Sequence, residues 1–246
     1  MLISAMVGID SRATMDIDTT LRNYPLNCES AEQIVRQIAD VEIDDKISFV
    51  IKKTEEIMEE SEYQGVRLSL DAYLDRTRIP LKIDISTGDV ITPCEISFSY
   101  QLMFENRTIP LLAYPPETVL AEKLETILSR GEANTRLRDF YDVYILQRGD
   151  FVVTPDALRY ALLATCRKRG HEDLLHTYAS ILDGVRQSGA MRTQWVKYQS
   201  DFDYAAGISW DTVVDTVETL CMKTLDDHAF GDELPQEESQ FEMHLL

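Results

Sequence analysis

The chain has 246 residues, of which 44% are hydrophobic, and it carries a formal net charge of −19 at pH 7. This apolar share is ample for one large core or two smaller ones, and no apolar run approaches the roughly 20 residues that a membrane span needs. The negative charge argues against a general nucleic-acid binder, because such proteins neutralise phosphates with lysine and arginine.

The charge is unevenly distributed along the chain. Residues 1–110 have a net charge of −9, residues 111–200 have +1, and residues 201–246 have −11. A polyanion would therefore meet strong repulsion everywhere except in the middle third. The segment 229–246 is acidic and polar, and we expect a mobile tail there.

The cysteines and the first residues bear on where the protein works. Four cysteines lie far apart without a CxxC pair, namely Cys28, Cys94, Cys166 and Cys221. This spacing indicates reduced thiols in a cytoplasmic protein and argues against a zinc site. The opening MLISAMVG is too short for a secretory signal and has no basic flank.

The first half of the chain mixes helix and strand patterns. Leu2–Val7 predicts a buried helix, and Ser30–Asp40 predicts a second helix with Ser30 at its N-cap. The run Ser-Thr-Gly-Asp at 86–89 predicts a turn. Alternating or apolar runs predict strands at 15–20, 47–51, 66–74, 79–85, 95–104 and 107–113.

After Pro115-Pro116 the pattern becomes helical. Pro116 suits the first position of a helix, and Gly131 suits its end. Further helices are predicted at 136–147, 155–168, 174–187, 190–199 and 210–225. We therefore expect an α+β chain with a mixed half at 1–113 and a helical domain at 114–228.

Three strand-borne aspartates form the first candidate site. Asp16 and Asp18 lie two apart in RATMDIDTTL, so one strand face carries both. Asp84 lies between Ile83 and Ile85 in LKIDIS, and strands of one sheet could bring all three carboxylates together. Such a group can hold two Mg²⁺ ions that activate a hydroxyl and stabilise a leaving phosphate. Solvated surface acids remain the alternative.

The first helical segments add charged residues. Lys123 and Arg130 are seven apart and share a helix face, and so do Asp139 and Asp142, which are three apart. An ammonium and a guanidinium facing the carboxylates could bind a triphosphate. An internal ion-pair network, for example between Arg138 and Asp142, would leave the same pattern.

The string YPPETVLAEKLETILSR…TRLRDFYDVYIL resembles the signature of the AbiEii/AbiGii toxin family, with AEKL followed by an Arg and by R-x-[KR]-D-x-x-D. RATMDID resembles the family's R-x-[ST]-x-D-x-D segment, and LKIDIS its third-carboxylate strand. The resemblance covers residues 1–150 well. It implies a polymerase-β-type nucleotidyltransferase fold, with a mixed sheet and flanking helices, followed by an α-helical domain.

The resemblance also implies roles for individual residues. It implies that Asp16, Asp18 and Asp84 bind metal, with two Mg²⁺ ions as cofactors and an NTP as substrate. The implied catalytic set comprises these acids with Lys123, Asp139 and Asp142. The implied nucleotide-binding set is Arg12, Thr14, Arg130 and Arg138.

One feature departs from the family pattern. The family has a Gly-Gly or Gly-Ser turn before the helix represented here by LISAMVG, and its backbone amides approach the phosphates. This sequence starts at Met1, so either the true start lies upstream or the phosphate-binding turn is missing.

Three function classes follow from these observations. The first is a nucleotidyltransferase toxin of an abortive-infection, phage-defence system, which modifies a tRNA or another RNA. The second is a small-molecule nucleotidyltransferase. The third is a catalytically impaired NTP-binding protein. For the toxin, the resemblance implies an antitoxin encoded nearby, and we expect no stable complex with it and no membrane partner.

Overall fold

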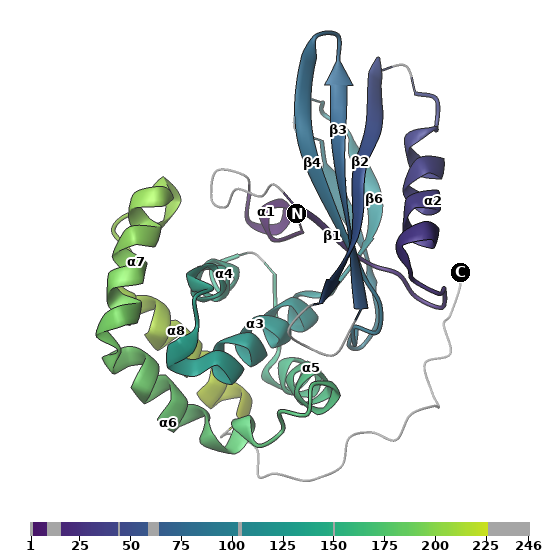
Figure 1. The fold of residues 1–246 in the computed structure, drawn as a ribbon. Helices are drawn as coiled ribbons and strands as arrows, with labels where there is room; N and C mark the ends of the chain where they lie inside the picture. Colours follow the sequence, from purple (N-terminus) through teal and green to yellow (C-terminus); the bar gives the residue numbers. More distant parts are fainter. Residues whose placement is uncertain are drawn as a thin grey trace.

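The computed structural model describes residues 2–8, 16–43, 45–58, 64–102, 105–149 and 151–225. Figure 1 shows two parts, a sheet with one helix along its outer face and a group of helices below it. The expected α+β class with a mixed sheet and flanking helices is confirmed.

The larger sheet has four strands in the order β1-β4-β3-β2. Strand β1 runs parallel to β4, and the other neighbours are antiparallel. The strands are β1 (Asp16–Thr20), β2 (Ile47–Met58), β3 (Gln64–Leu74) and β4 (Thr77–Ser86). Strand β2 runs seven residues past its predicted end, because its antiparallel pairing with β3 continues there. This extension contains charged residues of β2, and an edge strand tolerates charged side chains because they face solvent.

Helix α2 (Cys28–Ala39) covers one face of this sheet. Its Ala31 and Val35 pack on apolar strand residues of that face and form the smaller core. The predicted N-cap was wrong: Asn27 caps the helix, and Ser30 is the third helical residue. The Asn27 side chain accepts from the Ser30 amide (2.8 Å), and Ser30 Oγ accepts from the Asn27 amide (3.0 Å), which is a capping box.

A separate hairpin and the remaining helices complete the fold. Strands β5 (Ile96–Gln101) and β6 (Thr108–Ala113) form a second, two-stranded sheet. The helices are α1 (Leu2–Val7), α3 (Pro116–Arg130), α4 (Leu137–Leu146), α5 (Pro155–Lys168), α6 (Leu174–Gln187), α7 (Gly189–Asp201) and α8 (Trp210–Leu225), with short 3₁₀ turns at Gly131–Ala133 and Asp203–Ala205.

These helices share the larger core. Phe140, Trp195 and Trp210 belong to it, and the ring centroid of Trp210 lies 4.9 Å from that of Phe140 and 5.9 Å from that of Trp195. Ile3 of α1 also belongs to this core, although it lies in the first half of the sequence. The division into domains at residue 113 stays a prediction. Within the described part of the chain, no helix is both long and apolar enough to cross a membrane.

The cysteines differ in exposure, and this leads to a prediction. Cys94 is exposed, whereas Cys166 is buried, and burial, together with the nearby Glu125, raises the pKa of the Cys166 thiol to about 12. At pH 8 only roughly one Cys166 in 10⁴ is then a thiolate, the reactive form. We expect Cys94 to react quickly with a thiol reagent and Cys166 only in denaturant. Equal labelling rates for native Cys94 and Cys166, measured by mass spectrometry, would contradict this.

Candidate functional site

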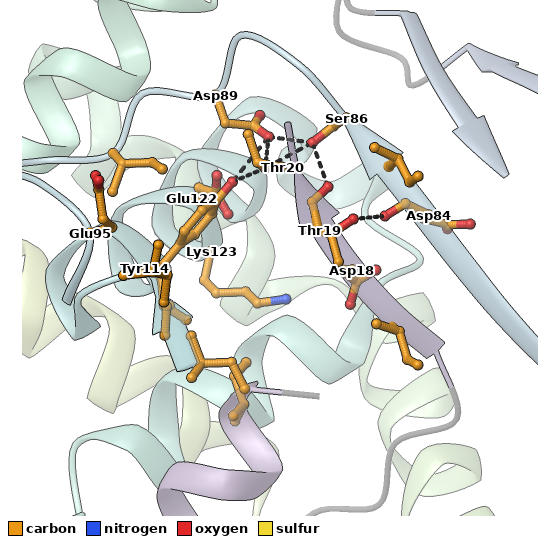
Figure 2. Close-up of a pocket in the computed structure, with 18 of the residues that line it drawn as sticks. Asp18, Thr19, Thr20, Asp84, Ser86, Asp89, Glu95, Tyr114, Glu122 and Lys123 are labelled. Carbon is orange, nitrogen blue, oxygen red and sulfur yellow. Dashed lines mark hydrogen bonds between the residues drawn. The ribbon is translucent and has the colours of Figure 1, made fainter. Parts of the chain in front are cut away.

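A cavity of about 830 Å³ lies between the larger sheet, the hairpin and the helices. Its walls come from the ends of β1 and β4, from β5 and β6, and from α1 and α3, with further residues from the start of α4 and the end of α5. Figure 2 shows the part where β1 meets α3. A volume of this size is typical of small-molecule sites.

Two predicted metal ligands lie side by side in this cavity. Asp18 and Asp84 are direct partners in the parallel β1–β4 pair, so their side chains share a sheet face, and both line the cavity. The backbone of Asp16 pairs opposite Lys82 on the same strands, but its side chain lies outside the described residues. Arg12 and Thr14 lie outside them as well.

Asp84 is held by an arginine. Arg67 lies opposite Asp84 in the β3–β4 pair. Its Nε donates to Asp84 Oδ1 (2.7 Å), and its Nη2 donates to Oδ2 (2.6 Å). This bidentate, charge-assisted geometry is stronger than an ordinary hydrogen bond. It offsets part of the repulsion between Asp84 and Asp18.

The donor chemistry fits Mg²⁺, which prefers carboxylate, water and phosphate oxygens. Asp18 and Asp84 supply carboxylate oxygens beside a cavity with room for water and phosphate. No group of three acidic, histidine or cysteine side chains poised for a metal occurs among the side chains that the structure describes. The third carboxylate that the sequence predicts for this site, that of Asp16, lies outside the described side chains.

Mg²⁺ at Asp84 would have to compete with the Arg67 guanidinium. We therefore expect Arg67→Gln to bind Mg²⁺ about three- to ten-fold more tightly than the wild type, while its metal-free form melts at a lower temperature. The measurement is the Mg²⁺ dependence of the melting temperature.

Arg78→Gln is the matched control for this prediction. Arg78 pairs with Asp71 (2.9 Å) on β4 and β3, and neither residue lines the cavity. This control should lose some stability without any change in Mg²⁺ affinity. Unchanged or weaker Mg²⁺ binding by Arg67→Gln would count against the competition.

Lys123 on α3 forms ion pairs with two aspartates of α4. Its Nζ lies 2.5 Å from Asp139 Oδ1 and 3.3 Å from Asp142 Oδ2. The side chain of Asp142 is fully buried and that of Asp139 is 6% exposed, whereas Lys123 is 24% exposed and lines the cavity. Figure 2 shows Lys123 reaching from α3 toward the strand that carries Asp18. The structure thus brings Lys123, Asp139 and Asp142 together as a partly buried ion-pair group.

Two predicted nucleotide-binding arginines that the structure describes, Arg130 and Arg138, lie outside the cavity lining. Arg138 places its guanidinium 5.7 Å from the ring centre of Phe202, and neither Arg138 nor Arg130 lines the cavity. Besides Lys123, three other described basic residues do line it: Arg22 after β1, Arg136 at the start of α4 and Arg169 at the end of α5. The nucleotide-binding role of Arg130 and Arg138 stays a prediction.

Asp89 is a cavity residue that sequence reasoning missed. Its Oδ2 accepts hydrogen bonds from the hydroxyls of Thr20 (2.7 Å), Ser86 (2.5 Å) and Tyr114 (3.1 Å). Figure 2 shows this group at the ends of β1 and β4. Burial, followed by the charge of Asp89, raises the pKa of Tyr114, so its hydroxyl stays protonated. The only signal in the sequence was the turn at 86–89.

Arg169 directly follows the last residue of α5, a position where a basic side chain commonly lies in solvent. Here it is mostly buried and pairs with the buried carboxylate of Glu125 on α3. Glu125 Oε1 also lies 2.6 Å from Nδ1 of His171. These contacts hold Arg169 at the cavity wall, and no local pattern predicts them because the partners are more than 40 residues apart.

A protein family and a solved structure are similar to this chain. A family profile described as the nucleotidyl transferase AbiEii toxin of type IV toxin–antitoxin systems matches residues 1–216. A solved structure described as a candidate nucleotidyltransferase from H. pylori is similar at 12% sequence identity, with a TM-score of 0.44, over 94% of this chain and 88% of that chain. No curated protein matches the sequence.

Proposed function

Because the chain belongs to the AbiEii family of nucleotidyl transferase toxins, we propose that it is a Mg²⁺-dependent enzyme that transfers a nucleotide from an NTP to an RNA acceptor such as a tRNA. The observation that carries this proposal is the placement of Asp18 and Asp84 on neighbouring parallel strands, in one cavity with Lys123. Its substrates would place this activity in the cytoplasm.

Asp18 and Asp84, with Asp16, would hold the metal. When bound, Mg²⁺ would activate the acceptor hydroxyl and stabilise the charge on the departing pyrophosphate. Lys123 contributes positive charge at the cavity, and its pairing with Asp139 and Asp142 restricts where its ammonium can lie. Arg136 and Arg169 add two further cationic side chains to the wall, which suits a triphosphate or an RNA phosphate.

The family description also bears on partners. A type IV toxin–antitoxin system includes an antitoxin, and we propose that this antitoxin acts without forming a stable complex with the toxin. The middle third of the chain, with its net charge of +1, is the part that an RNA could approach with least repulsion.

The test is a transfer assay with labelled nucleotides. The purified full chain is incubated with Mg²⁺, total RNA and each NTP in turn, labelled at either the α- or the γ-phosphate. We expect α-label, but not γ-label, to appear on RNA with at least one NTP, and chelation of Mg²⁺ to abolish the signal. Transfer of γ-label would indicate a kinase instead. Absence of α-label with every NTP and RNA would contradict the proposal.

A further inference from the structure

The β5–β6 hairpin has one apolar face. Phe98 and Tyr100 of β5 are half-buried and alternate with the more exposed Ser97 and Ser99. The same alternation on β6 makes Ile109 and Leu111 half-buried. Phe98 pairs opposite Leu111, and Tyr100 pairs opposite Ile109, so these four side chains share one face.

Within the part of the chain that the structure describes, this face belongs to neither hydrophobic core. Phe98, Tyr100 and Leu111 belong to neither of the two clusters of packed apolar side chains, but all three line the cavity. Within the described residues, the rings of Phe98 and Tyr100 stack on no other aromatic ring. Apolar side chains that turn toward a cavity instead of a core are typical of a ligand-binding wall.

The same cavity holds groups that would bind a phosphate chain, two carboxylates through Mg²⁺ and a lysine directly. Asp18, Asp84 and Lys123 line it together with the hairpin face, and its volume is about 830 Å³. A nucleotide has both kinds of surface, a charged phosphate chain and a planar base. If the phosphates of a nucleotide lie near Asp18, Asp84 and Lys123, its base can contact the apolar face of the hairpin.

We propose that the apolar face of the β5–β6 hairpin, with Phe98 and Tyr100 at its centre, binds the base of the incoming nucleoside triphosphate by stacking. The inference rests on the proposed function and adds a base subsite to it. Stacking on aromatic rings tolerates every base, because each base has a π-face. The Tyr100 hydroxyl offers one hydrogen bond to the base edge.

Binding of nucleotides is compared with binding of inorganic tripolyphosphate, which has the phosphates but no base. Dissociation constants are measured with Mg²⁺ by calorimetry for each NTP and for tripolyphosphate. For the wild type we expect the preferred NTP to bind at least about five-fold more tightly than tripolyphosphate. Phe98→Leu, which keeps the side chain apolar but removes the ring, should lose most of that preference and leave tripolyphosphate binding unchanged.

Ser99→Ala is the matched control, because Ser99 lies on the opposite face of the same strand, and it should behave as the wild type. Tyr100→Leu repeats the test at the second ring in case Phe98→Leu does not fold, and melting curves show which variants are folded. A wild type that binds every NTP no better than tripolyphosphate, or folded ring variants that keep the preference, would overturn the base subsite alone. A wild type that binds neither ligand would overturn the proposed function and this inference with it.

Discussion

Asp18→Asn is expected to abolish nucleotide transfer and to remove the rise in melting temperature that Mg²⁺ and NTP give the wild type. A ligand that binds only the native state stabilises it by mass action. Asparagine keeps the volume of aspartate but lacks the charge that holds the ion. Loss of metal stabilisation worth several kcal/mol lowers the rate by roughly 10³-fold.

The metal-free variant should stay folded. Asp18 is exposed and lies opposite Asp84, so removing its charge relieves a like-charge repulsion, and exposed substitutions usually change stability by no more than about 0.5 kcal/mol. Asp75→Asn is a suitable control. It makes the same chemical change at the β3–β4 turn, away from the cavity, where its φ of 51° suits asparagine.

Paired thermal melts, with and without Mg²⁺–NTP, measure both effects. If Asp18 had only a structural role, Asp18→Asn would lower the melting temperature without ligand and keep the ligand-dependent rise. That outcome would contradict the metal site. The same measurement on Asp16→Asn tests the second member of the pair, for which we expect the same loss of transfer.

Lys123→Met is expected to destabilise the fold by about 3–5 kcal/mol. The substitution removes the ammonium that pairs with the buried carboxylates of Asp139 and Asp142, and removing one partner of a buried ion pair is costly. Urea unfolding followed by circular dichroism measures the change. Lys197→Met on α7, an exposed lysine, should cost no more than about 0.5 kcal/mol.

A double variant separates the ion pair from other effects of the substitution. Adding Asp142→Asn to Lys123→Met removes the more deeply buried of the two carboxylate charges. It should recover part of the lost stability. If Lys123→Met costs no more than Lys197→Met, the ion pairs contribute little. Activity lost in Lys123 variants is informative only where stability has been measured, because the same lysine lines the cavity and joins α3 to α4.

The local elements of this protein follow from its sequence. Alternating apolar residues in Ile79–Ile85 and helical spacing after Pro116 both correspond to observed elements, β4 and α3. These patterns are readable because strand and helix periods depend only on neighbouring residues. The error at the end of β2 came from longer-range pairing, because β2 continues to Met58 beside β3.

The candidate site divides in the same way. Asp18 and Asp84 were candidate metal ligands from the residue types and spacing in RATMDID and LKIDIS alone. The fold places both in one cavity. Only the tertiary structure decided that Arg67 holds Asp84 and that Lys123 pairs with Asp139 and Asp142.

The cavity's other walls depended on tertiary packing as well. Only the fold turns the hairpin face of Phe98 and Tyr100 toward the cavity. The physical reason is that an ion pair or an apolar contact depends on which faces meet after folding. The sequence shows the chemical type of a charged or aromatic residue but not the residue that it will contact. The partner of Arg169, for example, is Glu125, 44 positions away on another helix.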